Sequence, residues 1–327
     1  MREFDAKRFD TMVYNRCGRW GVKLPAISLG AWQTYGGYVT DEVSKQCLFR
    51  AFDLGITHFD FANNYGEPNG NAEVVCGRII KEMPRDELLI STKAGFLMHP
   101  GPYGEWLSRK YLLASLDASL KRLQLAYVDL FYAHRPDPNT PTDEVMDALD
   151  QAVRSGKALY AGLSNHSGED IRAKVAHAVA YHTARPIISQ SAYSMLDRHV
   201  ETGVLEACAE CGMGVIAFVP LAQGMLTEKY IQQAQPADSR LARSVDICAH
   251  RLQKRERIGQ VAKLSELAHR RGQTLAQMAI VWLLRRPEVI SVLIGASRPQ
   301  QIEENVAALN NRSFTREELA EIDAILA

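Results

Sequence analysis

The chain has 327 residues, of which 46% are hydrophobic and 23% charged, a composition typical of a globular enzyme with a large core. Its 38 basic and 38 acidic side chains cancel, and the isoelectric point is about 7.1, so no broad attraction to nucleic acid or to an anionic membrane is expected. No apolar run reaches membrane-spanning length, and six scattered cysteines without a secretory leader predict reduced thiols in a cytoplasmic protein.

Strand-like and helix-like segments alternate from residue 26 onward. Short apolar runs predict eight strands, at residues 26–30, 56–60, 88–93, 127–134, 158–163, 187–191, 214–219 and 289–294. A helix runs from the N-cap Thr40 to Gly55, and others are predicted at residues 72–81, 109–122 (capped by Ser108), 143–154, 168–180, 204–211 and 299–309. No linker interrupts these units. We therefore predict one α/β domain over residues 1–327, a closed (β/α)8 TIM barrel rather than an open sheet or two domains.

Three segments fall outside this repeat. Residues 13–25 predict an N-terminal β-hairpin that plugs the N-terminal end of the barrel. A long loop insertion at residues 221–272 follows strand seven and contains a charged helix at 252–271; such long loops usually act as binding loops or lids. A C-terminal helix at 316–326 begins with a capping box from Thr315 to Glu318.

Two short motifs are tempting, but their context argues against a site. Cys208 and Cys211 have CxxC spacing but no second pair, and they fall in a helical segment, which favours two small packed side chains over a metal or redox site. Residues 212–217 fit the dinucleotide pattern G-x-G-x-x-A. That pattern requires a strand before it and a helix after it, whereas here the order is reversed. We interpret it as a helix C-terminal glycine followed by strand seven.

Four polar residues lie at or just past the C-terminal ends of predicted strands: Asp60, Tyr65, Lys93 and His134. Barrel enzymes carry their chemistry at that end. Each residue taken alone has an ordinary structural alternative, such as a loop cap, a turn aromatic, a solvated strand end or a satisfied loop histidine. Their convergence on one barrel face favours a shared proton-transfer site.

The chemistry of these side chains makes a specific hypothesis. A neighbouring ammonium favours a phenolate, so Lys93 is expected to lower the pKa of Tyr65 from about 10, each unit being worth about 1.4 kcal/mol. Asp60 would hold the lysine charged and oriented, while His134 donates a hydrogen bond to a substrate oxygen. This arrangement suits protonation of an oxygen that gains negative charge, as in carbonyl reduction.

The same residues lie in strings that resemble the aldo-keto reductase signature. These strings are GITHFD at 55–60, NYG at 64–66, ISTK at 90–93, YVDL at 127–130, HRPD at 134–137 and ISVLIGAS at 290–297. The resemblance extends over nearly the whole chain and is closest to the branch of potassium-channel β subunits and bacterial L-glyceraldehyde 3-phosphate reductases. Segments 93–95, 100–104, 108–111 and 220–224 favour the bacterial reductases. It implies a barrel that reduces carbonyls with NADPH, without a metal.

The resemblance implies roles for matching positions. Tyr65 would be the general acid, Lys93 its activator, Asp60 the lysine's partner beside the cofactor, and His134 the residue that orients the carbonyl. The nicotinamide would be held by Ser164, Asn165 and Gln190, with Phe218 stacked on its ring, and Trp32 would border both cofactor and substrate. The pyrophosphate and adenosine half would contact Pro220, Leu221, Gln223, Gly224, Gly295, Ser297, Gln301, Glu304 and Asn305. Lys229, Arg240 and Arg298 would supply positive charge for the 2′-phosphate, although each is equally readable as an exposed charge.

Departures from the family pattern leave two functional hypotheses. Tyr38 and His134 stand where the channel subunits carry glutamine and asparagine, which favours an active reductase. Asn165-His166 differs from the pair typical of the glyceraldehyde-phosphate reductases. The loop at 96–106, with Phe96, Met98 and Tyr103, is expected to set substrate preference. The first hypothesis is a reductase of small aldehydes and ketoaldehydes, such as L-glyceraldehyde 3-phosphate or methylglyoxal; the second is an NADPH-holding regulatory or sensor subunit. The resemblance also suggests a homo-oligomer.

Overall fold

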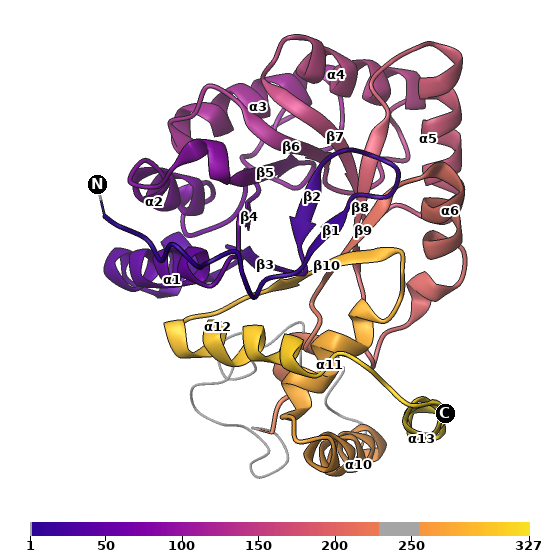
Figure 1. Ribbon diagram of the computed structural model, residues 1–327. Coiled ribbons are helices and arrows are strands. Elements are labelled where there is room, and N and C mark those ends of the chain that lie inside the picture. Colours follow the sequence, from indigo (N-terminus) through magenta and orange to yellow (C-terminus); the bar gives the residue numbers. More distant parts are fainter. Residues whose placement is uncertain (1, 229–254) are drawn as a thin grey trace.

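The computed structural model describes residues 2–228 and 255–327, and within them eight parallel strands close into a barrel (Figure 1). Around the barrel the strand order is β10-β3-β4-β5-β6-β7-β8-β9. These strands are β3 (Ile27–Gly30), β4 (His58–Asp60), β5 (Leu89–Ala94), β6 (Val128–Ala133), β7 (Ala158–Ser164), β8 (Pro186–Ala192), β9 (Gly214–Phe218) and β10 (Val289–Ile294). The predicted (β/α)8 barrel is confirmed.

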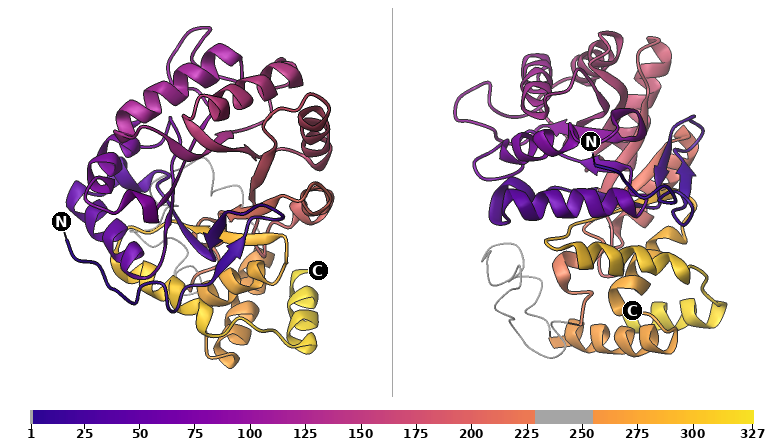
Figure 2. Two further views of the ribbon diagram at one scale, coloured as in Figure 1. Left: turned by 45° about the horizontal axis from the view of Figure 1, so that its top comes forward. Right: turned by 60° about the vertical axis from the view of Figure 1, so that its left-hand side comes forward.

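Helices surround the strands, as both views in Figure 2 show. They are α1 (Asp41–Asp53), α2 (Asn71–Ile80), α3 (Arg109–Leu123), α4 (Thr142–Arg154), α5 (Gly168–Ala180), α6 (Val204–Cys211), α10 (Arg255–Arg270), α11 (Leu275–Leu284), α12 (Pro299–Val306) and α13 (Arg316–Leu326). Helix α10, which belongs to the insertion, packs against α11 and α13. No helix among the described residues is long and apolar enough to cross a membrane.

The predicted helix starts are confirmed by their caps. The side chains of Thr40 and Ser108 accept hydrogen bonds from backbone N–H groups in the first turns of α1 and α3. Both halves of the capping box between Thr315 and Glu318 are formed at α13. These polar caps satisfy N–H groups that have no partner within the helix, so each fixes where its helix begins.

One predicted strand is shorter in the structure, and one predicted helix is described only in part. Strand 56–60 is shorter than predicted and begins at His58, because the N–H of Ile56 still bonds to the carbonyl of Ala51 at the end of α1. The predicted helix at 252–271 is described from Arg255, and its first three residues lie outside the described part of the chain.

Gly212, with φ +66°, ends α6 directly before β9, which confirms the interpretation of the G-x-G-x-x-A pattern.

The hairpin of β1 (Tyr14–Arg16) and β2 (Lys23–Pro25) covers the N-terminal end of the barrel. At its turn Gly18 has φ +54°, and a Cβ there would lie 2.3 Å from the carbonyl oxygen of Gly212, so only glycine fits. Next to it Cys17 is fully buried and donates to the carbonyl of Ile187 at 3.2 Å. The predicted plug is confirmed.

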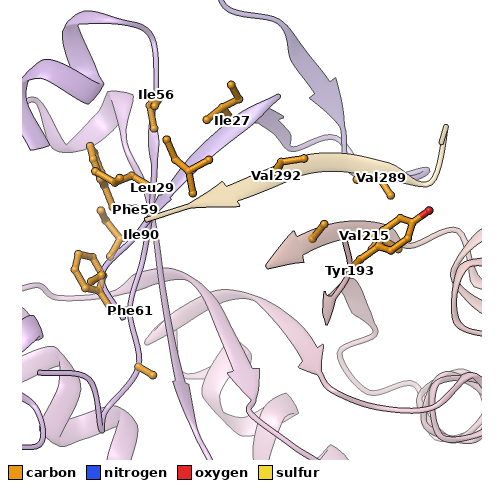
Figure 3. Packing of buried hydrophobic residues seen from close by; sticks show 14 of the residues in the cluster. Ile27, Leu29, Ile56, Phe59, Phe61, Ile90, Tyr193, Val215, Val289 and Val292 are labelled. Carbon is orange, nitrogen blue, oxygen red and sulfur yellow. The ribbon is translucent and has the colours of Figure 1, made fainter. Parts of the chain in front are cut away.

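The alternation of side chains in β4 separates the core from the site. Phe59 packs in the hydrophobic cluster with Leu29 and Ile90, its register partners on β3 and β5 (Figure 3). His58 and Asp60, one residue to either side, point into the barrel and bond to polar side chains there. The strand therefore buries an apolar outer face while it delivers a carboxylate to the barrel interior.

Candidate active site

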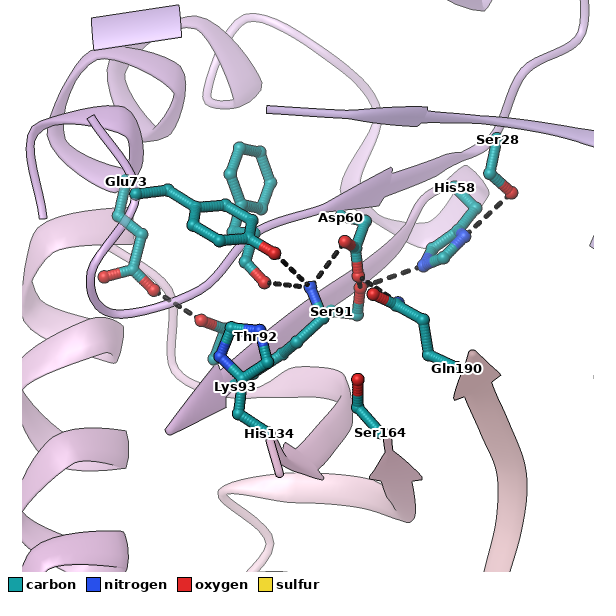
Figure 4. A network of polar contacts seen from close by, with 12 residues as sticks. Ser28, His58, Asp60, Glu73, Ser91, Thr92, Lys93, His134, Ser164 and Gln190 are labelled. Carbon is teal, nitrogen blue, oxygen red and sulfur yellow. Dashed lines mark hydrogen bonds and ion pairs between the residues drawn. The ribbon is translucent and has the colours of Figure 1, made fainter. Parts of the chain in front are cut away.

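The four polar residues predicted to form a site converge at one end of the barrel. A cavity of about 1370 Å³ opens at the C-terminal ends of the strands, and Asp60, Tyr65 and His134 line it. Lys93 is fully buried and reaches this group from β5 (Figure 4). A cavity of this size accommodates both a dinucleotide and a small substrate.

A buried ion pair stands at the centre of the group. The Nζ of Lys93 lies 2.5 Å from Oδ2 of Asp60, and both side chains are fully buried. Nζ also donates to the carbonyl oxygen of Phe61 at 2.7 Å. Burial lowers the pKa of Lys93, and the Asp60 carboxylate opposes this by favouring the ammonium. Oδ1 of Asp60 accepts from Ser91 at 2.6 Å and Gln190 at 3.0 Å, so both carboxylate oxygens have donors.

The hydroxyl of Tyr65 lies 3.4 Å from Nζ of Lys93. The loop that holds it turns at Gly66, where φ is +92° and a Cβ would lie 2.4 Å from the backbone nitrogen of Ala72. Burial, followed by the charge of Asp60, raises the pKa of Tyr65 well above 10. The expected lowering of the Tyr65 pKa by Lys93 is therefore wrong, because the Asp60 carboxylate largely cancels the charge of the ammonium.

His134 completes the group from the end of β6. Its ring packs edge-on against Phe96 at 4.6 Å and Tyr65 at 5.8 Å between centroids. Burial, reinforced by the charges of Lys93 and Arg135, lowers the pKa of His134 well below 6.5, so the ring is neutral at pH 7. Among the described residues, Nδ1 has no hydrogen-bond partner. A neutral imidazole is a hydrogen-bond donor rather than an acid here.

The predicted nicotinamide contacts form a polar wall beside this group. The side-chain amide of Asn165, a residue with φ +62°, donates to the carbonyl of His134 at 3.0 Å and to Oγ of Ser164 at 3.1 Å. Gln190 donates to Asp60 from β8, and Phe218 ends β9. The cavity is lined by Ser164, Asn165, Gln190 and Phe218, and also by Trp32. The wall offers amide and hydroxyl groups next to an aromatic face, which suits a planar carboxamide ring.

The other end of the cavity lies between the loops after β9 and β10. Of the residues predicted to contact the pyrophosphate, the adenosine or the 2′-phosphate, the following line the cavity: Pro220, Leu221, Gln223, Gly224, Gly295, Ser297, Arg298 and Gln301. Arg298 is the N-cap residue of α12, and Gln301 accepts from the N–H of Ser297 at 2.8 Å. Glu304 and Asn305 lie further along α12 and do not line it, whereas Lys229 and Arg240 lie outside the described residues. Backbone N–H groups and an arginine at a helix start fit a phosphate.

Sequence reasoning missed several residues that line the cavity, among them Gln33, Asn64, Arg135, Tyr193 and Asp197. Asn64 and Arg135 are direct neighbours of Tyr65 and His134, and the last two follow β8. The rule that strand ends carry the chemistry would have found all of these if it had been extended to whole loops. The guanidinium of Arg135 stacks on Phe96 at 4.4 Å and pairs with Glu105.

A closed (β/α)8 barrel with buried polar side chains gathered at the C-terminal ends of its strands has the layout of a barrel enzyme. The model of the Aldo/keto reductase family matches residues 26–327, and the chain belongs to this family. It is 49% identical over 328 residues to "L-glyceraldehyde 3-phosphate reductase" of Escherichia coli (strain K12), covering 98% of this chain and 94% of that protein. It is 42% identical over 320 residues to "Putative voltage-gated potassium channel subunit beta" of Schizosaccharomyces pombe, covering 94% and 92%. A counterpart from Arabidopsis thaliana is 39% identical over 303 residues, covering 91% and 92%.

The match confirms the resemblance stated from the sequence, to the family and to both of its branches. The protein is accordingly an aldo-keto reductase that acts on small carbonyl compounds. Members of this family typically use a nicotinamide nucleotide as hydride donor.

Proposed function

We propose that the protein is an NADPH-dependent reductase of small aldehydes and ketoaldehydes, such as L-glyceraldehyde 3-phosphate or methylglyoxal, with Tyr65 as the proton donor. The observation that carries this proposal is the contact of 3.4 Å between the Tyr65 hydroxyl and the ammonium of Lys93, inside a cavity that His134 also lines. The similarity to the Escherichia coli reductase over almost its whole length supports the choice of substrate.

The residues of this chain perform the proton half of the reaction. NADPH, when bound, supplies a hydride to the carbonyl carbon. Neutral His134 donates a hydrogen bond to the carbonyl oxygen and orients it. Tyr65 transfers its phenolic proton to that oxygen as negative charge develops there, which leaves an alcohol and a phenolate. Lys93, held charged by Asp60, stabilises the phenolate until a proton returns.

The high pKa of Tyr65 is consistent with this role. A phenol whose pKa lies well above 10 is fully protonated at neutral pH, so the donor is always loaded. Its proton leaves only when a stronger base appears, and the oxygen of a carbonyl that has accepted a hydride is such a base. The ammonium of Lys93 therefore acts mainly on the phenolate that forms during the reaction.

NADPH would be held along the cavity in an extended form. Ser164, Asn165 and Gln190 are suited to bond the nicotinamide carboxamide, and Phe218 to stack on the ring. The N–H groups at the start of α12 would bind the pyrophosphate, and Arg298, together with Lys229 and Arg240 from the undescribed part of the insertion, the 2′-phosphate. Glu304 and Asn305 would bind the adenosine. Substrate would lie against Trp32 and Phe96, whose ring is in contact with His134.

The test is the loss of NADPH absorbance with short aldehydes. We expect turnover of methylglyoxal or glyceraldehyde 3-phosphate by the wild type, a preference for NADPH over NADH, and a loss of at least about 100-fold in kcat for Tyr65→Phe. No turnover with any short aldehyde would refute the enzyme proposal. Full activity of Tyr65→Phe would show that another group is the acid.

A second candidate function is an NADPH-holding regulatory or sensor subunit. It is favoured by the similarity to proteins named as potassium channel β subunits, at 42% and 39% identity. His134 argues for the reductase, because it supplies a hydrogen-bond donor at the carbonyl position. If the protein is a sensor, NADPH binds tightly and turnover stays far below 1 per second for all aldehydes. Mixing the NADPH complex with an aldehyde then oxidises only the one nucleotide bound to each protein molecule.

Location and assembly belong to the same proposal. We expect a cytoplasmic protein, which the buried free thiols Cys17, Cys47, Cys76 and Cys208 support, since reduced cysteines are typical of that compartment. We also expect a homo-oligomer, as the family resemblance suggests. Light scattering of the purified protein measures the second point directly, and a mass of 36.5 kDa would contradict it.

A further inference from the structure

A chain of buried polar side chains leads from Asp60 into the barrel interior, and Figure 4 shows its members Asp60, Ser91, His58 and Ser28. Of these, only Asp60 lines the cavity. Oδ1 of Asp60 accepts from Oγ of Ser91 at 2.6 Å, and that Oγ lies 2.9 Å from Nε2 of His58. Nδ1 of His58 lies 2.9 Å from Oγ of Ser28, which lies 2.7 Å from Oγ of Ser291. All five side chains are fully buried. They come from β3, β4, β5 and β10.

The chemistry of these groups fixes the direction of every proton. The Asp60 carboxylate, paired with Lys93, can only accept, so Ser91 donates to it. The one proton of Ser91 is then used, and its oxygen must accept from Nε2–H of His58. Burial lowers the pKa of His58 to about 4, so the ring carries a single proton at pH 7 and its Nδ1 accepts from Ser28. Ser291 in turn donates to Ser28. Each hydrogen bond therefore points toward Asp60.

The other ionisable groups around Asp60 do not replace the hydrogen bonds that it accepts from neutral donors. Among the described residues, those that interact with Asp60 or its partner Lys93 are Glu73 from α2, Tyr65 after β4, Tyr132 from β6, His134 at the end of β6, and His58 itself. The two tyrosines are held protonated and His134 is held neutral by burial, while Glu73 is a second carboxylate, bonded to Thr92 and Arg122. Glu73 has its own cation in Arg122, whereas Asp60 pairs with Lys93 and takes its other hydrogen bonds from the neutral donors Ser91 and Gln190.

We propose that Ser91 and His58 are positioning residues of the reaction, which hold Asp60 as an anion, and Lys93 as a cation beside Tyr65, through a one-way chain of hydrogen bonds. The inference rests on the proposed function, since it concerns the same proton donor. A carboxylate that loses a donor is more easily protonated. When this series of hydrogen bonds is broken, the ion pair of Asp60 and Lys93 should therefore be lost at a higher pH than in the wild type.

The first test is the acid limb of the pH profile of kcat/KM. For Ser91→Ala we expect this limb to move to higher pH by about one unit, with kcat lowered and KM within about twofold of the wild type. The matched control is Ser189→Ala, which also removes a buried hydroxyl. This hydroxyl bonds to Ser191 at 3.2 Å and to none of the five side chains that lead from Asp60 to Ser291. The control should keep the wild-type limb.

The second test uses two amides at His58. The amide nitrogen of glutamine reaches the place of Nε2 and can donate to Ser91, whereas that of asparagine reaches only the place of Nδ1. We expect His58→Gln to keep the acid limb within about 0.3 unit of the wild type and His58→Asn to move it upward like Ser91→Ala. A structural role alone would lower activity for both without separating their limbs.

The outcomes separate the inference from the proposed function. If the wild type oxidises NADPH with short aldehydes but the limbs of Ser91→Ala and Ser189→Ala coincide, or those of the two His58 variants do, the inference is wrong. If the wild type reduces no aldehyde, the proposed function is wrong and the inference falls with it. Circular dichroism of each variant ensures that folded proteins are compared, and either pair alone decides the question.

Discussion

Removing the Lys93 ammonium should destabilise the protein strongly, because it leaves a buried carboxylate without its counter-ion. Lys93 and Asp60 are fully buried and lie 2.5 Å apart, unlike the exposed ion pairs, which contribute about 0–1 kcal/mol each. Removing one partner of a buried pair costs about 3–5 kcal/mol. In Lys93→Met, a chain of similar length, Asp60 retains only the neutral donors Ser91 and Gln190. We therefore expect a loss of about 3–5 kcal/mol in the free energy of unfolding.

The matched comparison is the double variant Asp60→Asn/Lys93→Met, in which no buried charge is left over. Urea unfolding followed by circular dichroism gives the midpoints of the wild type, the two single variants and the double variant. We expect the double variant to be at least as stable as Lys93→Met, so that the two losses are far from additive. Additive losses, or a loss below about 1 kcal/mol for Lys93→Met, would show that the charges do not depend on each other.

Three further outcomes concern the nucleotide, the substrate and pH. Arg298→Ala should weaken NADPH binding about tenfold in a fluorescence titration and NADH binding less than about twofold, since only NADPH carries the 2′-phosphate; equal losses would contradict this. Arg135→Gln should raise KM for glyceraldehyde 3-phosphate at least about fivefold more than KM for glyceraldehyde, because this cation lines the cavity beside Phe96; equal changes would mean that it only packs. Burial lowers the pKa of His58 and His166 to about 4, so as the pH falls the unfolded chain binds protons at these two residues before the folded protein does. The stability that depends on their neutral rings is therefore full above about pH 6.5 and is lost as the pH falls toward 4. Urea midpoints should fall by the equivalent of a few kcal/mol over this range, and a flat response would contradict the assignment.

The fold was predictable because its signals are local and repeated. Alternating strand and helix patterns placed all eight barrel strands, and the caps at Thr40, Ser108 and Thr315 fixed helix starts that the structure confirms. The strand containing Asp60 was drawn two residues too long. Apolar character alone does not tell that Ile56 still bonds back to α1, which is a property of the backbone path.

The candidate site was predictable in its members but not in its electrostatics. Strand-end positions brought Asp60, Tyr65 and His134 to one cavity, with Lys93 buried beside them. The expected direction of the Tyr65 pKa was wrong, because a sequence shows the neighbouring lysine but neither the depth of burial nor the carboxylate that cancels its charge.

The contacts of His58 with Ser28 and Ser91 were likewise hidden from the sequence. They join side chains about 30 residues apart on the neighbouring strands β3, β4 and β5, and two ordinary residue types, serine and histidine, carry them. Hydroxyl and imidazole groups inside a barrel become visible as a chain only when the register of neighbouring strands is known. Residues that line the cavity from the middle of loops, such as Asp197, were missed for a different reason, because the strand-end rule was not extended to whole loops.

The central claim, that Tyr65 is the proton donor, is tested most directly by a single turnover. Enzyme in excess with bound NADPH is mixed rapidly with a short aldehyde, and the first-order loss of NADPH absorbance reports the chemical step without product release. The account predicts that Tyr65→Phe slows this step at least about 100-fold. Tyr132→Phe is the matched control, since it removes a buried hydroxyl from a ring whose centroid lies 5.8 Å from Nζ of Lys93, and it should leave the rate within about twofold. A Tyr65→Phe enzyme that reacts as fast as the control would contradict the account.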